Sequence, residues 1–205
     1  RKADKALYLA KEKGKNRHII YEERLHGKLE TDDMQNMAMA YAVSKEKKRE
    51  AITEIITELC VSGVNAIVKS EERLQQIRSL FDLDGITVFS DRGNRLVCRN
   101  GNYMAEAPDG RLGFEDEGYL SLFGDDDIFV ESNMIKLRSQ NPAAYAVTQE
   151  QEVGAALQCL SRKEGIPYTM VSFEVFNRNR KWSDKDVTLL TLLGHCIGDL
   201  LNYSE

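Results

Sequence analysis

The clearest pattern in the sequence is an alternation of residues near its C-terminal end. Between residues 168 and 176 every second position falls on one side of an extended chain, as in a β-strand with one buried face (Thr169, Val171, Phe173 and Val175). An apolar run at 154–160 comes before it, and the turn-forming residues 162–165 separate the two. The pattern predicts a β-hairpin.

A long helix is expected directly after this hairpin. Ser183 can accept a backbone hydrogen bond at the helix start, and Asp184 and Asp186 lie where the helix dipole favours negative charge. Downstream, apolar positions recur at spacings of three and four (Val187, Leu190, Leu193, Gly194, Ile197 and Leu201). A neighbouring stripe is also apolar (Leu189, Leu192, Cys196 and Leu200). A helix that is apolar over so wide an arc is usually buried on two sides.

The N-terminal part is predicted to be helical over residues 31–61, where neither Gly nor Pro occurs. Alternating spacings of four and three form a heptad series (Met34, Ala38, Tyr41, Lys45, Lys48, Ile52, Ile55 and Leu59). Because Lys45 and Lys48 make the middle of the series polar, two interpretations remain open. The stretch is either one continuous signalling helix, or a connector followed by a separate helix at 44–61 that covers a sheet.

The middle of the chain predicts a capped helix from Ser70 to Phe81, and then a hairpin at 85–90 and 95–99. Residues 100–150 are less regular, with a short strand expected at 128–130 and a helix at 132–138. This region carries aromatic side chains that either line a ligand pocket or simply fill the space over the sheet (Tyr103, Phe114, Tyr119, Phe123, Phe129 and Tyr145).

The order of these elements resembles a GAF domain, a module that senses small molecules. The resemblance is carried by residues 154–160, 166–176 and 182–201, which read as strand, turn, strand, a Ser-x-x-Asp sequence and an amphipathic helix. It implies an α/β (α+β) fold with one antiparallel sheet and helices packed on one face. It also implies that the irregular region 100–150 walls the ligand cavity.

Residues 3–17 read Ala-Asp-Lys-Ala-Leu-Tyr-Leu-Ala-Lys-Glu-Lys-Gly-Lys-Asn-Arg. They closely resemble the C-terminal end of a GGDEF domain, the diguanylate cyclase module that makes cyclic di-GMP. In that family the positions of Lys11 and Lys15 face the nucleotide phosphates. The rest of the cyclase pocket is not in this sequence, so we expect a solvated helix tail and no catalytic site in the chain itself. The implied division is a GGDEF-like tail at 1–22, a helical linker at 23–43 and a GAF-like domain at 44–205, cut from a longer protein.

The composition of the chain limits the kinds of partner that it can bind. The 205 residues carry a formal net charge of −5, which argues against bulk binding to nucleic acid or to an anionic membrane. No apolar stretch has the length of a membrane span, and we expect a cytoplasmic location with reduced cysteines. The 4 cysteines and 3 histidines lack metal-ligand spacing, so the sequence predicts neither a metal nor another cofactor.

Together these patterns predict a regulatory sensor and dimerisation module of a bacterial cyclic di-GMP signalling protein. It would relay a small-molecule or partner signal through helices to a GGDEF-type catalytic domain in the same protein. The alternative is a ligand-free scaffold that only dimerises its parent protein. In both cases we expect a homodimer held by the first and last helices (Ile52, Ile55, Leu59, Leu189, Leu192 and Leu200).

Overall fold

The computed structural model describes residues 31–90, 95–101, 116–150 and 152–203, together with residues 6, 20, 22 and 24. Lys11 and Lys15 lie outside these residues, as do Tyr103 and Phe114. The chain divides into two compact units, residues 1–50 and 51–205, and the sheet belongs to the second. Among the described residues, no helix combines the length and the apolar character needed to cross a membrane.

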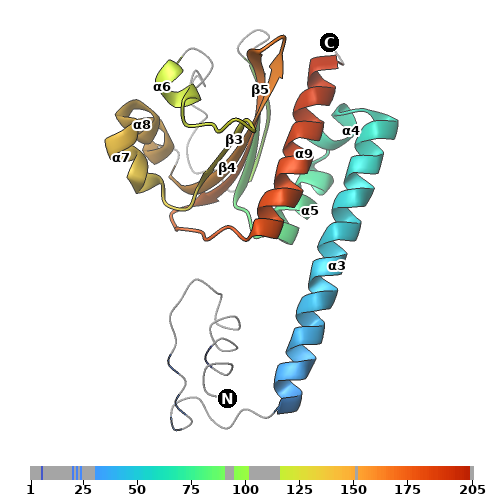
Figure 1. Cartoon of the computed structure of the whole chain (residues 1–205). Coiled ribbons are helices and arrows are strands. Elements are labelled where there is room, and N and C mark those ends of the chain that lie inside the picture. Colours follow the sequence, from blue (N-terminus) through green and yellow to red (C-terminus); the bar gives the residue numbers. More distant parts are fainter. Residues whose placement is uncertain are drawn as a thin grey trace. The chain divides into compact units, whose positions relative to one another are not determined.

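The second unit is built on a 5-stranded antiparallel sheet with the strand order β2-β1-β5-β4-β3 (Figure 1). The strands span β1 Gly85–Ser90, β2 Arg95–Gly101, β3 Ile128–Glu131, β4 Val153–Lys163 and β5 Ile166–Phe176. Both predicted hairpins are present, as β1–β2 and β4–β5. Pairing of β1 with β5 joins the hairpins at the centre of the sheet, and β3 adds an edge beside β4.

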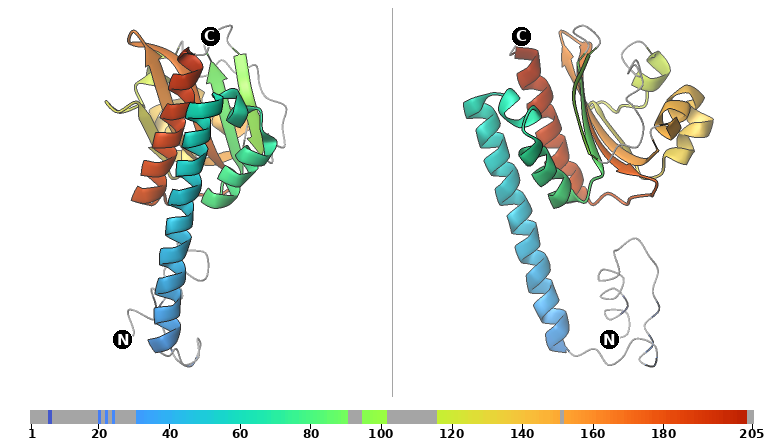
Figure 2. Two further views of the ribbon diagram at one scale, coloured as in Figure 1. Left: turned by 90° about the vertical axis from the view of Figure 1, so that its right-hand side faces the viewer. Right: turned by 180° about the vertical axis from the view of Figure 1, so that it is seen from behind.

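One face of the sheet is covered by α5 Glu71–Phe81 and α9 Asp184–Tyr203, which contact its strands (Figures 1 and 2). The other helices on this side are α4 Asn65–Val68 and α3 Thr31–Ser62, whose residues Ile52, Ile55 and Leu59 pack in the same core. The helix α3 runs unbroken through Lys45 and Lys48, which agrees with the first of the two interpretations of this stretch. The predicted helix starts are confirmed, because Ser70 Oγ accepts from Arg73 N at 3.3 Å and Ser183 Oγ accepts from Asp186 N at 3.1 Å.

The opposite face of the sheet carries a group of short helices, which we call the cap. The cap consists of α6 Glu117–Leu120, the 3-10 turn η1 Met134–Lys136, α7 Leu137–Gln140 and α8 Pro142–Glu150. The helix predicted at 132–138 is therefore split between η1 and α7. The helix α8 was not predicted, because Pro142 suggested a helix stop. Pro142 instead begins α8, where proline has no backbone hydrogen bond to lose.

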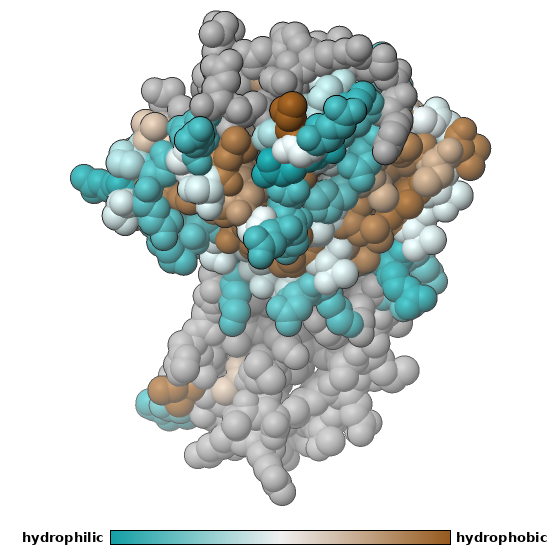
Figure 3. All heavy atoms as spheres, turned by 45° about the horizontal axis from the view of Figure 1, so that its top comes forward, coloured by the Kyte–Doolittle hydropathy of each residue, from teal (hydrophilic) through white to brown (hydrophobic). Residues whose placement is uncertain are grey.

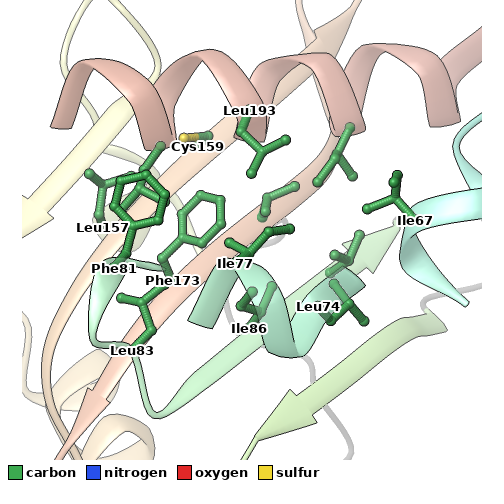
Figure 4. Packing of buried hydrophobic residues seen from close by; sticks show 14 of the residues in the cluster. Ile67, Leu74, Ile77, Phe81, Leu83, Ile86, Leu157, Cys159, Phe173 and Leu193 are labelled. Atoms are coloured by element: carbon green, nitrogen blue, oxygen red, sulfur yellow. The ribbon is translucent and has the colours of Figure 1, made fainter. Parts of the chain in front are cut away.

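The helix-side core is tightly packed where α9 crosses β4 and β5. Figure 4 shows Leu193 of α9 next to Cys159 of β4, with Phe173 of β5 beside them. A Cβ atom placed on Gly194 would lie 2.6 Å from Cys159 Sγ and 2.9 Å from Cys159 Cβ. Only a residue without a side chain lets the helix approach the strand so closely at this position.

Loops bond to the chain at the two ends of the edge strand β3. Ile128 is engaged by the preceding loop, since its carbonyl accepts from Gly124 N at 3.1 Å and its amide donates to Asp126 Oδ1 at 3.3 Å. Just past the other end of the strand, the carbonyl of Ser132 accepts from Arg180 N at 3.0 Å. The loops on either side therefore cover both ends of this edge.

Candidate functional site

A row of polar residues crosses the cap-side face of the sheet. The strand register places Arg99 opposite Thr87, Thr87 opposite Ser172, and Ser172 opposite Gln158. Ser172 and Gln158 are polar, yet both are buried, at 1% and 7% exposure. We call Thr87, Ser172, Gln158 and the adjacent Glu174 the polar row. Buried polar groups of this kind are kept only where they have partners, so the row is a candidate recognition site.

Hydrogen bonds connect the polar row to the cap. Tyr119 of α6 donates its hydroxyl hydrogen bond to Gln158 Oε1, and its oxygen lies 3.8 Å from Met170 Sδ. Gln158 Nε2 in turn donates to Ser172 Oγ at 3.2 Å. Burial raises the pKa of the Tyr119 hydroxyl well above its ordinary value, although the hydrogen bond to Gln158 partly offsets this. Tyr119 is therefore a neutral donor that fixes the orientation of the Gln158 amide.

Glu174 places a carboxylate in the same face at 4% exposure. Thr87 Oγ1 donates to Glu174 Oε2 at 3.2 Å. Gly85 stands opposite Glu174, and Gly101 stands opposite Gly85 on the next strand. A Cβ atom on Gly101 would lie 2.2 Å from the carbonyl oxygen of Asp84, so the neighbouring backbone requires glycine at this position. Glycine in a strand is typical of sites that another group approaches closely.

The aromatic residues predicted over the sheet divide into three groups. Tyr119, Phe123 and Phe129 are buried together, with ring centroids 5.7 to 6.5 Å apart. Tyr145 is half-buried and packs against the same cluster. Tyr103 and Phe114 lie outside the described residues. The three buried rings fill the space between cap and sheet, while the Tyr119 hydroxyl reaches the polar row.

An open depression of about 780 Å³ lies at the edge of the sheet. It is lined by residues of β3, of the segments around α6 and α7, and by Val187 of α9. Phe129 lines the depression, which therefore borders the aromatic cluster. No residue of the polar row lines it.

The residues predicted to hold a homodimer together have different surroundings. Ile52, Ile55 and Leu59 are at most 1% exposed within a single chain, where they pack in the helix-side core. The heptad spacing that suggested a dimer contact also fits packing within one chain, and that packing keeps these three side chains off the surface. Leu189 and Leu200 are partly buried against this core, whereas Leu192 is 50% exposed.

The exposed apolar side chains on this side of the molecule lie on two helices, α3 and α9. Val61 of α3 is 80% exposed and Cys60 beside it is exposed as well. Figure 3 shows apolar spheres gathered on the right-hand side, where α9 and the C-terminal end of α3 lie. Among the side chains of α3 and α9 whose exposure the structure describes, Val61 and Leu192 are the large apolar ones that are exposed, and we call them the patch.

All four cysteines lie away from the polar row. Cys98 and Cys159 are buried in the helix-side core, where burial raises their thiol pKa to about 11 and about 12. Cys196 lies on α9, and burial raises its pKa too. Cys60 is exposed on α3. Among the described residues, no group of three His, Cys, Asp or Glu side chains is placed to hold a metal ion.

Sequence reasoning missed the polar row. Ser172 and Glu174 occupy the positions of β5 that alternate with Val171 and Phe173, so they were placed on a solvent face. The structure buries both faces of this strand, because the cap covers the second one. The signal that could have identified them is the neighbouring strand, where Gln158 interrupts an otherwise apolar run.

Comparison with known proteins places the fold. No model of a known protein family matches the sequence, and no curated protein matches it. Among solved structures, the far-red absorbing dark state of JSC1_58120g3 with bound biliverdin IXa is similar with a TM-score of 0.58 and 17% identity, over 75% of this chain and 98% of that chain.

Two further structures have the same arrangement. The chromophore-binding domain of the bacteriophytochrome RpBphP3 from R. palustris gives a TM-score of 0.57 at 11% identity, over 78% of this chain and 61% of that one. The photoproduct state of GAF3 from Slr1393 of Synechocystis sp. PCC6803 gives 0.51 at 11% identity, over 69% and 94%. At these identities the likeness concerns the fold alone. The chain therefore has the α/β fold of GAF sensor domains.

Proposed function

We propose that this chain is the regulatory module of a signalling protein and that it binds a small polar molecule between the cap and the polar row. The observation that supports the proposal is the buried row itself. An apolar sheet face that served only as packing would have no reason to bury Gln158, Ser172 and Glu174 side by side. In GAF-fold proteins such as JSC1_58120g3, a ligand is bound.

The chemistry of the row favours a ligand with hydrogen-bond donors. Glu174 offers carboxylate oxygens, and Ser172 offers a hydroxyl that already accepts from Gln158. Gly85 stands opposite Glu174 on the next strand and brings no side chain to that position. A bilin attached through a thioether is not supported, because none of the four cysteines lies on this face.

The output of the module is proposed to be a GGDEF-type diguanylate cyclase domain of the same protein. The support is the sequence resemblance of residues 3–17 to the end of that domain, together with α3, which runs without a break from Thr31 to Ser62. Lys11 and Lys15 would then be remnants of its phosphate-facing surface. Two copies of the module are proposed to associate through the patch of Val61 and Leu192.

The alternative function is that of a scaffold without a ligand. It is favoured by Tyr119, Phe123 and Phe129, whose rings pack on one another under the cap. In that case the polar row would only orient the sheet and cap, and the exposed patch on the helices would be the functional surface.

A thermal-shift screen against a library of polar metabolites tests the proposal. A ligand present at 100 times its Kd should stabilise the protein by about 2.7 kcal/mol. Glu174→Gln and Ser172→Ala should each reduce the shift, whereas Glu54→Gln, at an exposed position of α3, should leave it unchanged. A ligand that stabilises all three variants equally would refute the site. If no ligand shifts the wild type while light scattering finds a dimer, the scaffold is the better description.

A further inference from the structure

The loop between β5 and α9, residues 177–183, touches both sides of the sheet. At its C-terminal end, Trp182 Nε1 donates to the carbonyl of Glu131 at 3.1 Å, and Arg180 N donates to the carbonyl of Ser132 at 3.0 Å. Glu131 ends β3 and Ser132 leads into η1, so these two bonds hold the chain where the cap begins. Trp182 is itself buried in the helix-side core, at 8% exposure.

Glu131 is held through its backbone and through its side chain. While its carbonyl accepts from Trp182, its carboxylate accepts from Asn133 N at 2.9 Å and pairs with Lys136 Nζ at 3.0 Å. Asn133 and Lys136 form the start and the end of η1. A displacement of η1 therefore acts on Glu131 and, through it, on the indole of Trp182.

Arg180 continues the connection to α9. Its side chain is 10% exposed, and its guanidinium lies 4.3 Å from the centre of the Trp182 ring. Nη1 donates to the carbonyl of Asp82 at 2.9 Å, and Nη2 pairs with Asp186 Oδ2 at 3.4 Å, in the first turn of α9. Burial lowers the pKa of the guanidinium, while Asp186 and Asp82 oppose that shift. One buried cation thus joins Trp182, the end of α5 and the beginning of α9.

We propose that Arg180 and Trp182 are positioning residues that couple the cap to the first turn of α9, so that a rearrangement of the cap loosens or tightens this helix. The role deepens the proposed function, because a molecule bound over the polar row would rearrange the cap. The competing route runs through the sheet, since α8 contacts β4 and α9 packs on β4. The two routes differ in their dependence on residues 180 and 182.

Arg178 provides a matched control in the same loop. Its guanidinium pairs with Asp82 Oδ2 and with Asp84 Oδ2, both at 3.2 Å, at the corner before β1. It resembles Arg180 in charge, loop and acidic partners. Its side chain bonds Asp82 and Asp84 at this corner, whereas the side chain of Arg180 also contacts Trp182 and Asp186.

The test loosens the cap without any ligand and measures hydrogen exchange in the whole chain. Ala144→Gly, at a buried position of α8, should raise cap opening at least about fivefold, because glycine lowers helix propensity and the buried methyl group is lost. When Arg180 and Trp182 are both unchanged, exchange of the α9 amides from Val187 to Leu190 should also rise, by about threefold or more. In the Trp182→Phe and Arg180→Met backgrounds, Ala144→Gly should change exchange at these amides by less than about 1.5-fold. In the Arg178→Met background the threefold response should persist.

Several outcomes would overturn the coupling. An equal response of α9 in all four backgrounds would assign the transmission to the sheet. If Ala144→Gly left exchange of the α9 amides unchanged while Arg180 and Trp182 were both present, the cap and α9 would be independent. Loss of the response in Arg178→Met as well would show that any damage to the loop suffices. Arg180→Lys, which keeps the charge and part of the contacts, should restore some of the response lost in Arg180→Met. Because no ligand is used, failure to find a ligand for the polar row leaves this result unaffected.

Discussion

Replacing Gly194 by alanine is the sharpest test of how α9 is seated on the sheet. Two effects of opposite sign compete. Alanine is better than glycine inside a helix by about 1 kcal/mol. The new methyl group, however, would lie 2.6 Å from Cys159 Sγ and 2.9 Å from Cys159 Cβ. The second contact involves an atom fixed to the backbone of β4, so a side-chain rotation cannot relieve it.

The balance should be unfavourable. Overfilling a packed core typically costs about 1–3 kcal/mol, and atoms closer than normal van der Waals contact force the helix or strand to shift. After the gain in helix propensity is subtracted, we expect Gly194→Ala to lower the free energy of unfolding by up to about 2 kcal/mol. Cys159→Ala removes the nearest atom, so the double variant should be more stable than the sum of the two single effects, by about 1 kcal/mol.

Urea denaturation followed by circular dichroism would measure all four members of this cycle. Asp199→Ala, at an exposed position of the same helix, reports the effect of helix propensity without a core contact and should be neutral or slightly stabilising. If Gly194→Ala proved as stable as wild type, α9 would not approach β4 as closely as the structure shows. Strict additivity with Cys159→Ala would equally contradict the argument.

Three further predictions concern chemistry, pH and association. With iodoacetamide at pH 8, the exposed Cys60 should be alkylated in the folded protein, whereas Cys98 and Cys159 should react only after unfolding; rapid labelling of Cys159 would contradict its burial and its pKa of about 12. Tyr119 keeps its proton in the folded state above pH 10, where the unfolded chain loses it, so its contribution to stability is present below about pH 10 and declines as pH rises further. Urea titrations at pH 9 and pH 11 should therefore show a smaller alkaline loss for Tyr119→Phe than for wild type, and an equal loss would refute this. Leu192→Glu should convert a homodimer into a folded monomer in light scattering, while a wild type that is monomeric at tens of micromolar would exclude the dimer.

Elements with a strong local period could be predicted from the sequence. The β4–β5 hairpin and the start of α9 at Ser183 follow from alternation, turn residues and a capping side chain, all of which are local, although the turn is shorter than the predicted 162–165 and consists of residues 164 and 165. The cap was harder, because its helices are short and Pro142 is compatible with either a stop or a start. Short helices take their stability from tertiary contacts that no local pattern encodes.

The candidate site could not be predicted for a related reason. Whether Ser172 meets water or a second layer of the protein depends on the cap, whose placement the sequence does not specify. The same ambiguity affected Ile52 and Leu59. Their spacing predicts a buried face, and only the arrangement of the whole unit determines whether a partner or the chain's own sheet buries it.

The loops at the two ends of β3 have a consequence for how the protein could aggregate. A bare edge strand is a template on which a second chain can add a strand, and this is a common start of aggregation. In this protein an incoming strand would first have to displace Gly124 and Asp126 from Ile128 and Arg180 from Ser132. Growth of fibrils by strand addition at β3 therefore requires local unfolding of the loops that cover it.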